Sequence, residues 1–385
     1  MTQRNLSPGQ STLLDFIRGL AAWSVLIGHS AQILLPSNPL AQMNMQGAGV
    51  FIFFLLSGFL ITYSALRKHN DPSYGFGAYF IDRFCRIFIA YIPALFFVLI
   101  VDYFTLQFLA PGEIVNGYTD LGARYNLMTW FGNLFMMQDY PAFQILSVAG
   151  VIPESAAIKS FGSAAPFWTI SIEWWIYMVF GVIALVYVRQ KKWPKVWHWP
   201  LLGLIALEPF YHFVTGPDNC LTMLWVMGML VCMLFLYPPK WLDFSNANIR
   251  IVMVLCALFA VVCMAMRIVG LRLDGSTDFL EFQFAVYMAM LVFGTLFFLS
   301  DKIDFPKFFK KISWFVADYS YSLYLTHHTI VIFLAAYFKR SDDPAIFWMA
   351  IVLSNLLAIF FWFLFERHYK RLARWMKMRF LGQKT

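Results

Sequence analysis

The feature that most constrains this chain is a series of apolar stretches, each about 20 residues long, that recurs along nearly its whole length. A helix needs about 20 apolar residues to cross the hydrocarbon layer of a bilayer. Backbone groups in lipid must bond within their own segment, so each stretch predicts a transmembrane helix. The fifth, which holds Glu208 and Pro209, is either a regular span or a broken, re-entrant helix. The predicted spans are 13–35, 46–66, 84–109, 166–188, 196–214, 219–237, 250–269, 281–300, 314–338 and 345–366.

The composition supports this interpretation. The chain is 60% hydrophobic and only 13% charged, whereas a soluble domain carries about 25% charged residues. So few charges cannot cover a water-facing surface of this size. We therefore expect an all-α integral membrane protein, a polytopic bundle of about ten transmembrane helices that forms a single domain over residues 1–385.

Lys and Arg gather in every second loop and in the C-terminal tail, while the loops between are poor in them. This positive-inside asymmetry predicts that both termini are cytoplasmic. The basic residues behind the net charge of +8 then orient the chain in the membrane and interact with anionic lipid. We therefore expect no nucleic acid as a partner. The residues concerned are Arg67, Lys68, Arg83, Arg86, Arg189, Lys191, Lys192, Lys195, Lys302, Lys307, Lys310, Lys311, Arg367, Lys370, Arg371, Arg374, Lys377 and Arg379.

Two of the segments outside the predicted spans stand out by length or composition. Residues 110–165 form the longest, an outer-face segment in which 125–143 is aromatic, rich in Met and nearly uncharged. We interpret 125–143 either as an interfacial or re-entrant helix or as a loop packed over the bundle. The basic tail, 367–385, is expected along the inner leaflet. The spacing of the five cysteines does not indicate a metal site.

The first span carries three ionisable residues, which are costly in a membrane and therefore candidates for function. Asp15 precedes Arg18 by three residues, so the two can pair on one helix face. Ten residues separate Arg18 from His29, and the eleven helical steps between them bring the two side chains within about 20° of one another around a helix and about 16 Å apart along it. The alternative is that Asp15 and Arg18 only pair at the interface and His29 bonds across helices.

Further candidates stand on later spans. Ser57 lies near the middle of the second span beside Gly58, where small residues favour close helix packing, and it could instead face a cavity. Arg83 and Arg86, at positions i and i+3, share a helix face at the start of the third. Guanidinium groups bind phosphates bidentately, although an isolated pair of this kind would be a positive-inside anchor.

The remaining candidates lie on the fourth and ninth spans. Glu173 is expected about 10 Å down its helix, at a depth similar to that of His29, so carboxylate and imidazole can meet. A buried carboxylate needs a partner. Tyr324 and His327 are three residues apart and can face one cavity. We expect Glu366 to be an ordinary boundary charge at the end of the tenth span.

Together these segments resemble the acyltransferase-3 family of ten-helix membrane acyltransferases. The resemblance rests on five motifs in the family's order, and residues 190–310 match nothing comparable. The first-span residues Asp15, Arg18 and His29 resemble its arginine–histidine signature. The other motifs are residues 53–59 around Ser57, the pair Arg83 and Arg86, residues 168–173 ending in Glu173, and residues 321–327 with Tyr324 and His327.

The resemblance implies a membrane O-acyltransferase of the bacterial inner membrane, which moves an acyl group, by family default acetyl from acetyl-CoA, to a hydroxyl of a cell-surface or lipid-linked carbohydrate. We hypothesise a tunnel in which Arg83, Arg86 and Arg18 bind coenzyme A, Ser57 lies at the same donor site, and His29 is the general base. Glu173 would orient the imidazole or hold the acceptor. An acyl-enzyme on Ser57 is an alternative to direct transfer. No metal is required.

A proton-coupled transporter or exporter of a glycan or small polar solute is the alternative function, because intramembrane Arg, His and Glu also suit proton relays. Such transporters often show inverted repeats, and the sequence has no such symmetry. A purely structural membrane protein would leave the aligned polar residues unexplained.

Overall fold

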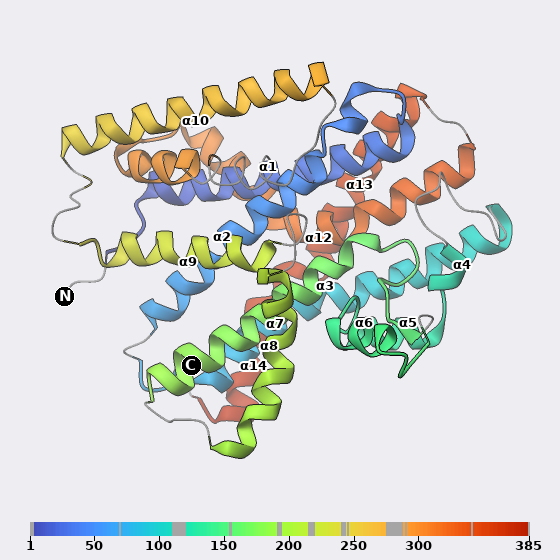
Figure 1. Ribbon diagram of the computed structural model, residues 1–385, viewed down its shortest axis with the longest axis horizontal. Coiled ribbons are helices and arrows are strands. Elements are labelled where there is room, and N and C mark those ends of the chain that lie inside the picture. Colours follow the sequence, from blue (N-terminus) through green and yellow to red (C-terminus); the bar gives the residue numbers. More distant parts are fainter. Residues whose placement is uncertain are drawn as a thin grey trace. The chain divides into compact units, whose positions relative to one another are not determined.

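The computed structural model of the chain is helical, with no strand among the residues it describes (Figure 1). The all-α class predicted from the sequence is therefore confirmed for this part of the chain. The described residues are 4–68, 71–109, 121–153, 156–190, 195–214, 220–239, 244, 246–274, 288, 291–339 and 342–383.

The long helices follow the apolar stretches, and shorter helices occupy the segments between them. The α-helices are α1 (Pro8–Leu34), α2 (Met45–Arg67), α3 (Phe76–Phe104), α4 (Leu121–Arg124), α5 (Leu127–Leu134), α6 (Pro141–Val148), α7 (Trp168–Val182), α8 (Trp199–Val214), α9 (Leu221–Leu236), α10 (Ala247–Asp274), α12 (Lys307–Phe338), α13 (Pro344–Leu364) and α14 (Tyr369–Leu381). The shorter turns are η1 (Pro39–Gln42), η2 (Thr105–Leu109), η4 (Ala165–Phe167), η5 (Ile183–Val188), η6 (Val196–His198), η8 (Ser300–Lys302) and η9 (Glu366–His368).

Five helical stretches are long and apolar enough to cross a membrane, and the count of ten spans stays a prediction, as do the cytoplasmic termini. Two further apolar helical segments are shorter, namely α9 (Leu221–Leu236) and the Ala247–Cys263 part of α10. The predicted fifth span is the single helix α8, with Pro209 inside it. Part of the predicted span 281–300 lies outside the described residues, and 291–299 is helical. The five are Pro8–Leu34, Met45–Arg67, Phe76–Leu109, Ala165–Val188 and Pro344–Leu381.

Local signals explain where several helices begin. The Asp343 side chain accepts a hydrogen bond from the Ala345 amide, and Pro344 occupies the first helical position of α13. A capping carboxylate followed by proline is a strong start signal, because it satisfies a free amide and presets φ. The Asn126 side chain caps α5 in the same way, through the Thr129 amide.

The chain divides into two compact units, and each is described by itself. Unit 1 comprises Met1–Gly19, Phe51–Arg67 and His212–Ala317. Unit 2 comprises Leu20–Val50, Lys68–Tyr211 and Asp318–Thr385. The predicted single domain over residues 1–385 stays a prediction.

In unit 1, α2 and α9 approach closely at two glycines. A Cβ atom on Gly58 would collide with the carbonyl oxygen of Trp225, and a Cβ atom on Gly228 would collide with that of Leu55. Small residues at such contacts let membrane helices touch through their backbones. The predicted packing role of Gly58 is therefore confirmed.

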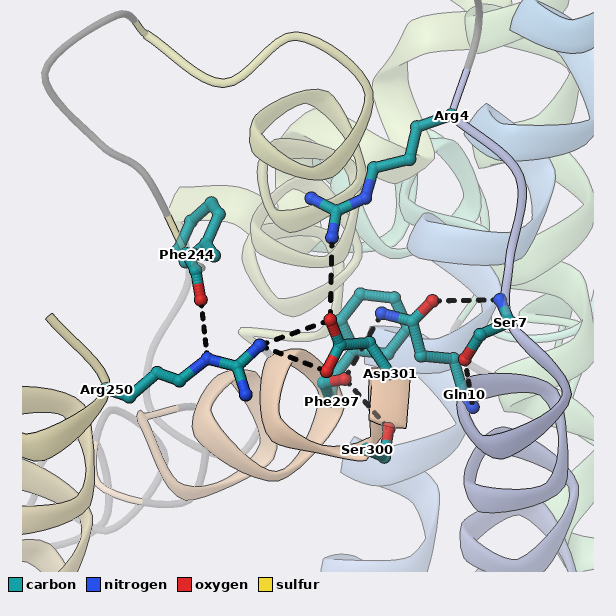
Figure 2. Close-up of polar contacts among 8 residues, drawn as sticks. All are labelled: Arg4, Ser7, Gln10, Phe244, Arg250, Phe297, Ser300 and Asp301. Carbon is teal, nitrogen blue, oxygen red and sulfur yellow. Dashed lines mark hydrogen bonds and ion pairs between the residues drawn. The ribbon is translucent and has the colours of Figure 1, made fainter. Parts of the chain in front are cut away.

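The N-terminal segment of unit 1 is held by a polar cluster (Figure 2). Both carboxylate oxygens of Asp301 accept hydrogen bonds from Arg250, each at 3.2 Å, and Arg4 lies 3.9 Å from the same carboxylate. The Gln10 amide donates to the Phe297 carbonyl at 3.4 Å. These bonds tie the residues before and at the start of α1 to the chain around η8.

In unit 2, α14 lies along α3 (Figure 1). Asp82 on α3 binds two lysines, Lys377 of α14 at 2.5 Å and Lys68 at 3.2 Å. Ala373 is buried in the same contact, beside Cys85. The predicted basic tail therefore contains a helix that packs on the protein, and its place at the inner leaflet stays a prediction.

The segment 125–143 is neither a single helix nor a loop. It holds α5, a turn in which Met136 and Asp139 have positive φ, and the start of α6. The Met136 carbonyl accepts hydrogen bonds from Ser171 and Trp175, so this turn packs on α7. The apolar side chain of Phe131 on α5 is 51% exposed, and that of Leu127 is 73% exposed, as an interfacial helix requires.

Candidate functional site

Three imidazoles meet in unit 2, where the His29 end of α1 contacts α12. Nδ1 of His29 lies 3.0 Å from Nε2 of His327, and the two ring planes differ by only 18°. The ring centroid of His328 lies 5.0 Å from that of His29, with the rings edge to face. His327 and His328 are buried, whereas His29 is partly exposed. That His327 and Tyr324 face one cavity stays a prediction, and the structure shows a direct contact between His327 and His29.

The two buried imidazoles are held by backbone carbonyls. Nδ1 of His327 lies 3.0 Å from the Leu323 carbonyl oxygen and 2.9 Å from that of Tyr324, both in the preceding turn of α12. Nδ1 of His328 lies 2.5 Å from the Ser163 carbonyl oxygen. Since carbonyl oxygens only accept, these ring nitrogens donate.

A buried carboxylate supports the loop that meets His328. The Ser163 amide donates to Asp102 at 2.7 Å, and the Ser163 hydroxyl donates to Thr329 at 2.8 Å. Asp102, on α3, is 1% exposed. Our sequence reasoning passed over Asp102 and Ser163. Asp102 could have been found as an ionisable residue inside the third predicted span, but Ser163 carries no local signal.

The turn of α12 that precedes His327 contacts the start of α7. The Tyr324 hydroxyl donates to the Pro166 carbonyl at 2.9 Å and lies 2.5 Å from the Thr169 hydroxyl. One turn further along α7, the Tyr177 hydroxyl donates to Glu173. Glu173 therefore has a hydroxyl partner within its own helix, while the hydrogen-bond partner of Nδ1 of His29 is Nε2 of His327.

A second polar cluster lies nearer the start of α12. Arg86 donates to Glu366 at 2.7 Å, and the Ser322 amide and hydroxyl donate to the other carboxylate oxygen at 3.0 and 2.7 Å. The rings of Tyr321 and Tyr369 lie 5.6 and 4.9 Å from the Arg86 guanidinium. Glu366 is only 1% exposed. Our interpretation of Glu366 as an ordinary boundary charge is wrong, because its carboxylate is buried and paired with Arg86. The pair is not visible in the sequence, since Arg86 stands 280 residues earlier.

Arg83 differs from Arg86 in its surroundings. Among the described residues no carboxylate pairs with Arg83, and its buried Nε has no hydrogen-bond partner there. Its guanidinium lies 5.9 Å from the centre of the Tyr79 ring. Nearby in sequence, burial raises the pKa of Tyr74, so its hydroxyl stays protonated beside Asp82.

The other predicted site residues lie in unit 1. Arg18 pairs with Asp15 at 3.3 Å, as their spacing predicted. Ser57 is 8% exposed, and its hydroxyl oxygen accepts a hydrogen bond from the Trp225 indole at 3.2 Å. Throughout the described ranges, no three His, Cys, Asp or Glu side chains are arranged to hold a metal ion.

Comparisons with known proteins agree with this architecture. The acyltransferase-3 family model, described as an acyltransferase domain, matches residues 12–375. The chain is 26% identical over 377 residues to O-acetyltransferase OatA of Staphylococcus aureus strain COL and to the protein of the same name in strain MW2. These alignments cover 92% of the chain and 56% of each relative, so the chain spans about half the length of these relatives.

No solved structure matches the chain significantly. The family match nevertheless covers nearly the whole sequence, including the helices that carry both polar clusters of unit 2. The chain belongs to the acyltransferase-3 family.

Proposed function

We propose that this protein is an O-acyltransferase of the bacterial inner membrane, which moves an acetyl group from acetyl-CoA to a hydroxyl of a cell-surface or lipid-linked carbohydrate. Membership of the acyltransferase-3 family supports acyl transfer, and the relatives named O-acetyltransferase support acetyl as the group and a hydroxyl as the acceptor. The apolar helices support a membrane location, with both termini in the cytoplasm as the charge asymmetry predicts.

His29 is the general base in this proposal. The observation that carries it is a partly exposed imidazole whose Nδ1 is hydrogen-bonded to the fully buried His327. A base must be reachable by substrate on one side and held in place on the other. The acceptor oxygen forms a bond to the acetyl carbon while its proton passes to His29. The carbon–sulfur bond breaks, and the proton passes on to the leaving thiolate.

Arg83 is our first candidate for binding the phosphates of coenzyme A. Its guanidinium has no carboxylate partner in the described part of the chain, so it can offer a charge-assisted, bidentate contact to a phosphate. Arg86 already neutralises Glu366 and would position the helices around the donor. Arg18, paired with Asp15, stays a candidate for a further donor contact.

Glu173 is a candidate for holding the acceptor, and Tyr324 is a candidate for positioning the helix that carries Glu173. The Glu173 carboxylate accepts a hydrogen bond from Tyr177, and a carboxylate has lone pairs for further hydroxyl groups. The Tyr324 hydroxyl connects α12 to the first turn of α7. Glu173 lies further along the same helix. Direct transfer requires no acyl-enzyme, so Ser57 acts as a packing residue bonded to Trp225 in this scheme.

The test is acetylation of glycans in living cells. The full chain is expressed in a strain that lacks its own copy, and extracted glycans are examined by mass spectrometry for base-labile acetyl groups. We expect acetylated glycans with the wild-type chain, nearly none with His29→Ala, and wild-type levels with His368→Ala, an exposed histidine on η9. Wild-type acetylation by His29→Ala at equal protein level would overturn the assignment of the base.

A further inference from the structure

We propose that His327 is a positioning residue that sets the tautomer of His29, so that Nε2 of His29 is the nitrogen that takes the acceptor proton. This inference rests on the proposed function, because it assigns atoms within the same proton transfer. Three contacts of the two imidazoles and the donor and acceptor capacity of a neutral imidazole determine where each proton lies.

The first step concerns the proton of His327. Its Nδ1 lies within hydrogen-bond distance of two backbone carbonyl oxygens, those of Leu323 and Tyr324. A carbonyl oxygen cannot donate, so the proton must be on Nδ1. A neutral imidazole carries one proton, which leaves Nε2 of His327 as an acceptor.

The tautomer of His327 then determines the tautomer of His29. Nε2 of His327 lies 3.0 Å from Nδ1 of His29. The near-coplanar rings, 18° apart, allow an in-plane hydrogen bond between these nitrogens. Because Nε2 of His327 accepts, Nδ1 of His29 must donate. His29 then has its lone pair on Nε2, the nitrogen on the opposite side of the ring from His327.

The same hydrogen bond also stabilises the charged form of His29. After His29 takes a proton, both of its nitrogens carry hydrogen, and Nδ1 still donates to the same lone pair on His327. The positive ring is therefore stabilised without a carboxylate at this position. A neutral partner suits a low-dielectric interior, where an extra buried charge would be costly to solvate.

His327 is held firmly enough for this role. It is fully buried, and both carbonyl partners belong to the preceding turn of its own helix. That turn is itself bonded to α7, through Tyr324 and Thr169. His328 is arranged differently, since its Nδ1 points to the Ser163 carbonyl and its ring stands edge to face against His29.

The test compares two substitutions at one position in membrane vesicles that contain the full chain and the glycans of the host strain. His327→Gln retains an acceptor oxygen close to the place of Nε2, whereas His327→Leu removes it. Tyr319→Phe is the matched control, because Tyr319 is a buried residue of α12 whose hydroxyl donates to Asn355. The measurement is the initial rate of coenzyme A release as the acetyl-CoA concentration is varied.

We expect His327→Leu to lower kcat roughly 10- to 100-fold, by analogy with the loss of a partner that orients a metal-bound imidazole. The KM for acetyl-CoA should stay unchanged, and His327→Gln should recover most of the rate. Tyr319→Phe should behave as wild type. A purely structural role would instead lower the amount of folded protein and would not distinguish Gln from Leu.

Two outcomes would overturn the inference. One is wild-type kcat in His327→Leu, and the other is an equal loss in His327→Leu and His327→Gln at equal protein levels. Either result with an inactive His29→Ala leaves the proposed base intact and removes only its tautomer partner. An active His29→Ala removes the proposed function itself, so the two failures are distinguishable.

Discussion

Two polar clusters of unit 2 share the helix α12 and differ in how fully they are satisfied. Ser322 meets the pair Arg86 and Glu366, and about 7.5 Å further along the helix His327 meets His29. In the first cluster both carboxylate oxygens are bonded, and the guanidinium lies close to two tyrosine rings. In the second, one ring is partly exposed.

The difference separates a fixed structural cluster from a reactive one. A buried ion pair whose remaining atoms are hydrogen-bonded contributes little binding capacity, because its charges are already neutralised. An imidazole held from one side can exchange a proton on the other. The same contrast divides Arg86 from Arg83, which share a helix face but not a carboxylate.

The largest effect that tests this comparison is expected at His29. In vesicles supplied with acetyl-CoA, His29→Ala should lower the rate of coenzyme A release roughly 10²- to 10⁴-fold, the usual contribution of a general base. Its midpoint of thermal unfolding should stay close to that of wild type, because the side chain is partly exposed. A large loss of stability with normal activity in the surviving protein would place His29 in the structural class.

The second effect is expected on stability. Glu366→Ala should lower the free energy of unfolding by about 3–5 kcal/mol, because it leaves Arg86 without its carboxylate in a largely buried site. Denaturant unfolding in detergent measures this change. Asp304→Ala, which removes the exposed partner of Lys310, is the control and should cost less than about 1 kcal/mol. Equal costs for the two variants would contradict the structural assignment of Glu366.

A smaller effect is expected for Arg83. Arg83→Ala should raise the KM for acetyl-CoA roughly 10- to 100-fold, which corresponds to the loss of a charged hydrogen bond of about 1.5–3 kcal/mol. Stability should change little. Initial rates at varied acetyl-CoA check this expectation, and Arg83→Lys should recover part of the affinity. An unchanged KM would remove Arg83 from the donor site.

The smallest effect is expected when both members of the ion pair are replaced together. Arg86→Met combined with Glu366→Leu should be less destabilising than Glu366→Ala alone, because no unpaired charge remains. The double-mutant cycle with each single substitution measures the coupling between the two residues. Additive losses would show that the pair acts as two independent contacts.

Much of the fold could be predicted because it depends on local pattern. The apolar stretches predicted the long helices, Asp15 and Arg18 pair as their spacing required, and Gly58 packs as a small residue should. The candidates His29, Glu173 and Arg83 could be named because ionisable residues are rare in apolar helices. Which partner each one meets could not be named.

The sequence by itself determined that the chain is helical and that its helices are apolar. It also identified the ionisable side chains within those helices, which are costly to bury and are therefore candidates for a structural or functional role. Only the tertiary structure decided that His29 meets His327 and that Glu366 neutralises Arg86. The reason is physical. Helix formation and i, i+3 pairing depend on residues within one turn, which the sequence displays directly. His29 and His327 are 298 positions apart in the sequence, and Arg86 and Glu366 are 280 positions apart. Such contacts depend on the rotation and register of packed helices, which are set by the whole bundle.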